Sequence, residues 1–307
     1  MRVAAIDIGT NSVLLLVAEL VAGRLEARRD ESTITRLGQG VDATGLLDAQ
    51  AVARTLACLG ECADHLRAEG VARVGAVATS ALRSAADGEP FLDRAAELIG
   101  ARPRVISGRE EAELTFEGAL GGLELPVGPV AVVDLGGGST ELIVGRAAPD
   151  GAAQIEAAVS LEVGSVRLSE RHLHHDPPLA QELEALRRDA RGALRAAPAL
   201  DGTTLVGVGG TVTSLCALAY EVVPYDHTRI HGARLSREQV TSLGARLGAL
   251  PLAARARLPA LDPRRADVIV AGALLLEQIV CGARAPQLHV SDRGVRWGLA
   301  ARLVRGA

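Results

Sequence analysis

Two related stretches decide the fold, AAIDIGTNS at residues 4–12 and AVVDLGGGS at residues 131–139. Each consists of an apolar, β-prone run, an Asp-x-Gly turn with small hydroxyl residues, and a second β-prone run. A single turn of this kind is more often only a hairpin connection. Two copies in corresponding places predict two domains of common origin, with a phosphate-binding cleft between them.

The chemistry of these turns is that of a phosphate loop. Glycine lets backbone N–H groups approach phosphate oxygens, and the neighbouring hydroxyls add donors. An aspartate at the end of the strand can hold a hydrated divalent cation. A third glycine turn, Gly209-Gly210-Thr211, follows a predicted strand at 204–208 and precedes a predicted helix at 212–220. It would place a helix N-terminus beside an anion, although an ordinary strand-to-helix connection has the same pattern.

Composition narrows the classes of function. The chain has 307 residues and 48% hydrophobic residues, enough for two globular domains. It has no apolar run of about 18 residues and no signal-peptide pattern at its start, so we expect a cytoplasmic protein without a membrane partner. All 33 basic residues are arginine, which excludes a Walker A loop and Schiff-base chemistry. The formal net charge of −4 gives no general attraction for polyanions, and no nucleic-acid partner is expected.

Further motifs carry a resemblance to a known family. The two phosphate loops and the GVGGTVTSL stretch at 207–215 resemble the nucleotide-site motifs of the actin-like (ribonuclease H-like) superfamily, which includes sugar kinases, Hsp70 and actin. Within it, ISGREEA at 106–112 and DLGGGSTE at 134–141 are similar to the Ppx/GppA family of exopolyphosphatases and guanosine pentaphosphate phosphohydrolases. Two departures are the absence of a C-terminal HD-like region and Gly210 in place of a serine.

The resemblance implies a fold and its boundaries. We expect an α/β protein of two actin-like domains, the first at 1–122 plus 293–307 and the second at 123–292. The implied activity is metal-dependent release of terminal orthophosphate from inorganic polyphosphate. The alternatives are hydrolysis of guanosine pentaphosphate, with guanosine penta- or tetraphosphate as ligand, a sugar-kinase-like phosphotransferase, and an alarmone or phosphate sensor. A homodimer is the oligomer expected.

The resemblance also assigns roles to residues. Glu111 is the expected general base, because Glu110 has a capping-box position after Ser107. Asp134 and Glu141 are the expected Mg²⁺ or Mn²⁺ ligands, with Asp7 contributing through water; in the first copy Leu14 aligns with Glu141. The expected phosphate ligands are the small and cationic residues of the three turns and of the ATSALR stretch: Thr10, Asn11, Ser12, Arg83, Gly136, Gly137, Gly138, Ser139, Thr140, Gly209, Gly210 and Thr211.

Overall fold

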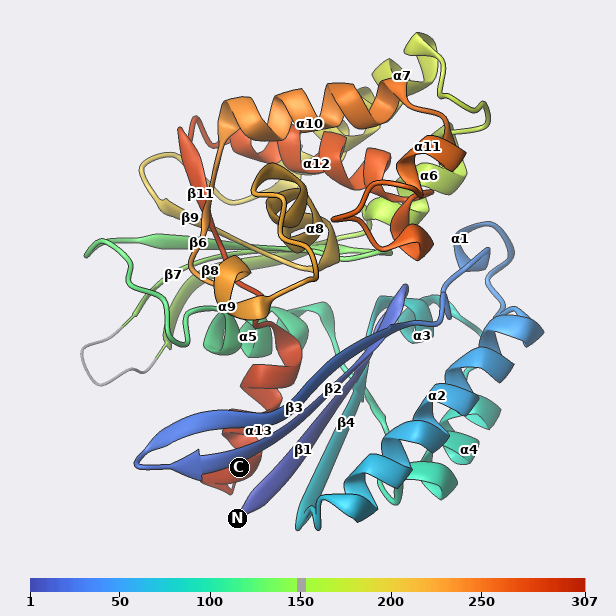
Figure 1. Cartoon of the computed structure of the whole chain (residues 1–307), viewed down its shortest axis with the longest axis vertical. Coiled ribbons are helices and arrows are strands. Elements are labelled where there is room, and N and C mark those ends of the chain that lie inside the picture. The colour runs from blue at the N-terminus through green and yellow to red at the C-terminus, as the bar shows by residue number, and fades with distance from the viewer. Residues whose placement is uncertain (148–152, 307) are drawn as a thin grey trace. The chain divides into compact units, whose positions relative to one another are not determined.

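The computed structural model describes residues 1–147 and 153–306 and divides the chain into two compact units. Unit 1 comprises Met1–Gly118 and Val295–Ala307, and unit 2 comprises Ala119–Gly294. Each unit contains one mixed β-sheet covered by helices (Figure 1). Among the described residues, no helix combines the length and the apolar character that crossing a bilayer requires.

The sheet of unit 1 has the strand order β3-β2-β1-β4-β5. Its strands are β1 (Arg2–Ile8), β2 (Ser12–Val21), β3 (Arg24–Ile34), β4 (Arg73–Ala78) and β5 (Arg104–Val105). Strands β1, β2 and β3 form an antiparallel meander, whereas β4 and β5 run parallel to β1. The first hairpin is the one that the 4–12 motif predicts.

Both faces of this sheet are buried, because alternate residues of a strand point to opposite sides. Ile6 and Ile8 of β1 belong to a core with helices α2 (Ala49–Ala68) and α4 (Glu89–Ile99), which lie against each other in Figure 1. Val3 and Ala5 belong to a second core with α5 (Gly108–Ala119) and α13 (Val295–Arg305). The C-terminal helix thus completes the fold of the N-terminal unit. The short helices α1 (Val41–Thr44) and α3 (Ser80–Ser84) lie in connecting segments.

The sheet of unit 2 repeats this arrangement and extends it by one strand. Its order is β10-β11-β9-β6-β7-β8, with β6, β7 and β8 antiparallel and with β9 and β11 parallel to β6. The strands are β6 (Val130–Leu135), β7 (Thr140–Ala147), β8 (Ala153–Leu161), β9 (Thr204–Val208), β10 (Arg234–Ser236) and β11 (Gln287–Val290). The shared order confirms the expected α/β fold of two actin-like domains.

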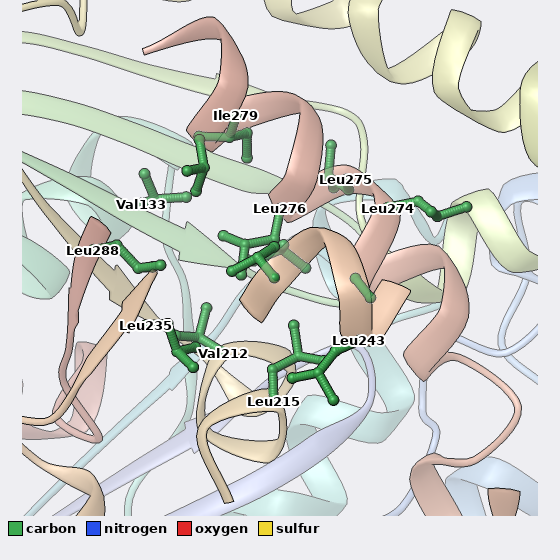
Figure 2. Packing of buried hydrophobic residues seen from close by; sticks show 14 of the residues in the cluster. Val133, Val212, Leu215, Leu235, Leu243, Leu274, Leu275, Leu276, Ile279 and Leu288 are labelled. Atoms are coloured by element: carbon green, nitrogen blue, oxygen red, sulfur yellow. The ribbon is translucent and has the colours of Figure 1, made fainter. Parts of the chain in front are cut away.

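The core of unit 2 is built around α12 (Ile269–Gly282), which is apolar on nearly every side because other helices and the sheet surround it. Figure 2 shows Leu243 of α10 (Arg237–Ala249) beside Leu215 of α8 (Gly210–Ala219), with Leu276 of α12 in the same core. The remaining helical segments are α6 (Ser165–His172), α7 (Ala180–Ala193), η1 (Leu194–Ala196), α9 (His227–Ile230), α11 (Leu252–Arg255) and η2 (Pro263–Arg265).

Candidate active site

In unit 1, the predicted site residues gather at one edge of the sheet. Strands β1, β4 and β5 are parallel, so their carboxyl ends share that edge, which is where open α/β sheets bind ligands. The amide of Thr79 donates to Ile8 O at 3.2 Å, and the amide of Ile106 donates to Ala78 O at 3.0 Å. Three segments therefore follow neighbouring strand ends: the 9–12 loop, α3 with Arg83, and α5 with Glu111.

The first phosphate loop turns its amides outward. Its hairpin is closed by a bond from the Gly9 amide to Ser12 O at 2.9 Å, and the carbonyls of Thr10 and Asn11 accept bonds from a backing segment at 35–38. Because a trans peptide is planar, the N–H that follows each carbonyl points the opposite way. The amides of Asn11 and Ser12 thus face away from the backing segment. Nearby, Asn11 Oδ1 and Ser80 Oγ are buried with no hydrogen-bond partner within residues 1–147 and 153–306, as expected of atoms that a ligand or water completes.

Glu111 and Arg83 form a buried ion pair. Arg83 Nη1 lies 2.5 Å from Glu111 Oε2 and also donates to Ile106 O at 3.1 Å. The side chains are 18% and 9% exposed, so water screens the pair only weakly. The predicted base and the predicted phosphate-binding arginine are therefore in direct contact.

Glu110, the neighbour of Glu111, has a different environment. Its amide donates to Ser107 Oγ at 3.2 Å, which is one half of the expected capping box. Its carboxylate pairs with Arg104 at 2.7 Å on the exposed side of the helix. The two consecutive glutamates thus have separate surroundings, one at the surface and one in the interior.

In unit 2, the second phosphate loop is built like the first. The Gly136 amide donates to Ser139 O at 3.0 Å, as Gly9 does to Ser12. The carbonyls of residues 136–138 accept bonds from the backbone of 165–167 and from Arg167 Nε, at 2.8 to 3.1 Å. By the same planarity argument, the amides of residues 137–139 point away from α6 together, which is the geometry of a backbone anion nest.

Two residues behind this loop are not predicted from the sequence. Gly164 precedes α6, and a Cβ on it would lie 2.5 Å from Gly137 O and 2.8 Å from Gly138 N. Arg167 carries the bond to Gly138 O and pairs with Glu162 at 2.7 Å. The only signal for either in the sequence is an isolated glycine just before a helix.

Asp134 and Glu141 are direct partners across the second hairpin. The register pairs Asp134 of β6 with Glu141 of β7, so both side chains point to the same face of the sheet. Glu141 is buried and accepts a bond from Ser160 Oγ at 2.6 Å. In the first hairpin the register pairs Asp7 with Leu14, so that copy lacks the second carboxylate.

The surroundings of this acidic pair suit a hydrated divalent cation. An ideal Cβ on Gly209 would lie 3.3 Å from Asp134 Oδ1, and one on Gly294 would lie 3.8 Å from Asp134 Oδ2, so neither glycine places a side chain of its own beside the carboxylate. Mg²⁺ binds through one or two carboxylates and keeps several waters. Within residues 1–147 and 153–306, no group of three or more histidine, cysteine or acidic side chains is arranged to hold a metal ion.

The third glycine turn contacts a further arginine. Gly209 has φ +97°, and a Cβ there would lie 2.6 Å from Leu135 O. The Arg265 guanidinium occupies the space over Gly210 where a side chain would be, and its burial lowers the pKa of that arginine. This contact is a physical reason for Gly210 at a position where a serine was expected.

Two predicted phosphate ligands have their side chains in the interior. Thr140 Oγ1 donates to Val163 O at 2.6 Å, and Thr211 packs against Gly272 of α12. The Thr140 hydroxyl proton is committed to the main chain. A contact of either residue with phosphate would therefore come from its amide.

Comparisons with known proteins follow this geometry. The model of the Ppx/GppA phosphatase family matches residues 16–306. The chain is 41% identical to Exopolyphosphatase 2 of Mycobacterium tuberculosis, over 98% of each protein. Among solved structures, it is similar to a Ppx/GppA family member from Aquifex aeolicus, with 34% identity, a TM-score of 0.82 and coverage of 100% of this chain and 98% of the other. It is also similar to an exopolyphosphatase from Cytophaga hutchinsonii, with 26% identity, a TM-score of 0.91 and coverage of 100% and 99%.

Proposed function

Because the chain belongs to the Ppx/GppA phosphatase family, we propose that it is an exopolyphosphatase, which hydrolyses the terminal phosphoanhydride bond of inorganic polyphosphate. The observation that carries this proposal is the buried carboxylate of Glu111, held by Arg83 at the edge where the first phosphate loop also lies. A buried carboxylate, an arginine guanidinium and outward-facing loop amides thus share one edge of the unit 1 sheet, which supports the proposal. The relatives named exopolyphosphatase support the choice of substrate.

In the proposed reaction, Glu111 accepts a proton from water while the water oxygen bonds to the terminal phosphorus. The bond from that phosphorus to the bridging oxygen breaks, and the electron pair leaves with the shortened chain, so orthophosphate is released. The chain's own contribution is to hold the phosphate end and to aim the water, because such reactions are accelerated by positioning and by charge stabilisation. Arg83 and the loop amides of Asn11, Ser12 and residues 137–139 are the groups proposed to hold the phosphate.

We propose that the cofactor is Mg²⁺ or Mn²⁺, held by Asp134 and Glu141 with Asp7 acting through water. When bound, the cation supplies charge neutralisation for phosphate oxygens. The all-oxygen donor set and the two glycines beside Asp134 support a hard cation. A homodimer and a cytoplasmic location remain predictions from the sequence.

The test compares turnover of purified protein on long polyphosphate, short polyphosphate and guanosine pentaphosphate, each with Mg²⁺. We expect polyphosphate to have the highest kcat/KM. Glu111→Gln should lower kcat by roughly 10²–10⁴, the usual contribution of a positioned base. The matched control is Glu110→Gln, which removes the same charge one residue away and should keep near-native turnover. A higher kcat/KM on guanosine pentaphosphate would overturn the substrate, and equal losses in both variants would overturn the role of Glu111.

A further inference from the structure

We propose that Arg83 is a gate on the base: without substrate it holds the Glu111 carboxylate, and an arriving phosphate end takes its guanidinium and releases the carboxylate to water. The inference rests on the proposed function, since it assumes that Glu111 accepts a proton from water. The proposed function gives Glu111 the role of base and Arg83 the role of phosphate ligand. The gate adds a step in which Arg83 exchanges Glu111 for the substrate phosphate.

The ion pair has the strength that a gate needs. Arg83 donates a charge-assisted hydrogen bond to Glu111, and both side chains are largely buried. An arginine bound to a carboxylate occupies its lone pairs and neutralises its charge, so the carboxylate is a poor proton acceptor while the pair lasts. The pair therefore opposes catalysis unless something breaks it.

Backbone hydrogen bonds hold the main chain beside the Arg83–Glu111 pair in place, while the two side chains can still move. The Glu111 amide donates to Ser107 O at 2.9 Å in the first turn of α5, which holds the main chain in place. Arg83 Nη1 also donates to Ile106 O at 3.1 Å, a main-chain contact that does not depend on the carboxylate. The guanidinium can thus remain at the site edge when its carboxylate partner is replaced.

A phosphate end is a suitable competitor for the guanidinium. Like a carboxylate, it presents oxygens that match the planar arginine fork, and it carries more negative charge than Glu111 does. Binding of substrate then breaks the Arg83–Glu111 bond, creates an arginine–phosphate contact and releases Glu111 from Arg83. This couples activation of the base to the presence of the phosphate that will be attacked.

The first test measures binding of a methylene-bridged triphosphate analogue, which cannot be cleaved, by calorimetry. Glu111→Gln should bind it about tenfold tighter than the wild type, because the analogue no longer has to break a charged bond. Glu110→Gln, which removes one negative charge nearby without touching the pair, corrects for the general gain in attraction. Added to an Arg83→Gln background, Glu111→Gln should gain no more than Glu110→Gln does. An equal gain of the two glutamate variants in the wild-type background, where Arg83 is present, would overturn the gate.

The second test uses pH–rate profiles on short polyphosphate. The profile of kcat/KM reports the free enzyme, where the pair is closed, and that of kcat reports the complex, where it is open. The acid limb of kcat/KM should therefore lie about 1–3 pH units below that of kcat in the wild type, and Arg83→Gln should remove this gap. Arg104→Gln, which breaks the exposed pair with Glu110, should retain the gap.

A conservative variant and unfolding temperatures distinguish loss of the gate from loss of the fold. Arg83→Lys, which keeps the charge, should restore part of the gap, and unfolding temperatures show whether each variant is folded. A wild-type enzyme that hydrolyses polyphosphate with coincident limbs refutes the gate and leaves the proposed function intact. A wild type with no turnover of any phosphoanhydride refutes the proposed function itself.

Discussion

Replacing Gly164 with alanine should damage catalysis more than it damages the fold. The added Cβ would lie 2.5 Å from Gly137 O, 2.6 Å from Gly137 C and 2.8 Å from Gly138 N, and all three are backbone atoms of the second phosphate loop. Reaching an ordinary contact of 3.4 Å from the oxygen requires a displacement of about 0.9 Å. Either the loop at 137–139 or the start of α6 must therefore move.

The two consequences have different sizes. Overpacking of this kind costs about 1–3 kcal/mol in the free energy of unfolding, which a two-unit protein with a large core can tolerate. A displacement near 1 Å of groups that bind the reacting phosphate lowers the rate by about 10²-fold. We therefore expect a small fall in Tm and a large fall in kcat/KM on polyphosphate.

The assay is steady-state orthophosphate release, with thermal unfolding measured on the same samples. Gly192→Ala is the matched control in unit 2, because no heavy atom lies within 4 Å of its added Cβ in α7. It should keep full activity and gain up to about 1 kcal/mol in helix stability. Native kcat/KM in Gly164→Ala would refute the claim that residues 137–139 form the phosphate-binding amides.

Three other outcomes are expected. Asp134→Asn should raise the Mg²⁺ concentration needed for half-maximal activity more than tenfold, and full activity of the wild type in a chelator would contradict the metal site. Hydrogen bonds, first of all from His175, lower the pKa of Glu182 to about 2 in the folded protein. The ionised carboxylate therefore stabilises the fold at pH values above its ordinary pKa of about 4.5, and this stabilisation is lost as the pH falls towards 2. The stability difference between wild type and Glu182→Gln, followed by denaturant unfolding, should thus shrink over that range, and a constant difference would disprove it. Iodoacetamide should label exposed Cys281 long before Cys216, whose burial raises its pKa to about 11, and peptide mapping with the reverse order would exclude this.

The strands that carry the site are predictable from the sequence, and the outer strands of both meanders are not. The hairpin strands and β9 have apolar runs that end in glycine turns, so local pattern and tertiary structure agree. Strand β3, RLEARRDESTI, is mostly polar and exposed and exists because β2 pairs with it along its length. Strand β8, AQIEAAVSL, is rich in alanine, and its pairing with β7 is likewise what makes it a strand. Pairing between segments overrides propensity in both cases.

The same distinction applies to the candidate site. The sequence predicts that Asp134 and Glu141 are neighbours because a tight hairpin fixes its register. The contact of Arg83 with Glu111 needs the parallel order of β1, β4 and β5, which brings the ends of separate strands together. Gly164 is further still from a sequence-based inference, since its importance comes from a close approach of two backbones.

The two hairpins have the same backbone structure but carry different side chains. Both turns are closed by the same glycine-to-serine bond, and in both the carbonyls accept bonds from a neighbouring segment. The loop geometry proposed to bind phosphate is therefore a property of the repeat. The acidic pair is not shared by the two copies, because the cross-strand partner of Asp7 is Leu14 whereas that of Asp134 is Glu141. The buried carboxylate proposed as the base, Glu111, is instead in unit 1. The Asp134–Glu141 pair lies in unit 2 and the Glu111–Arg83 pair lies in unit 1, so the groups proposed to bind the cation and to accept the proton come from different copies of the repeat.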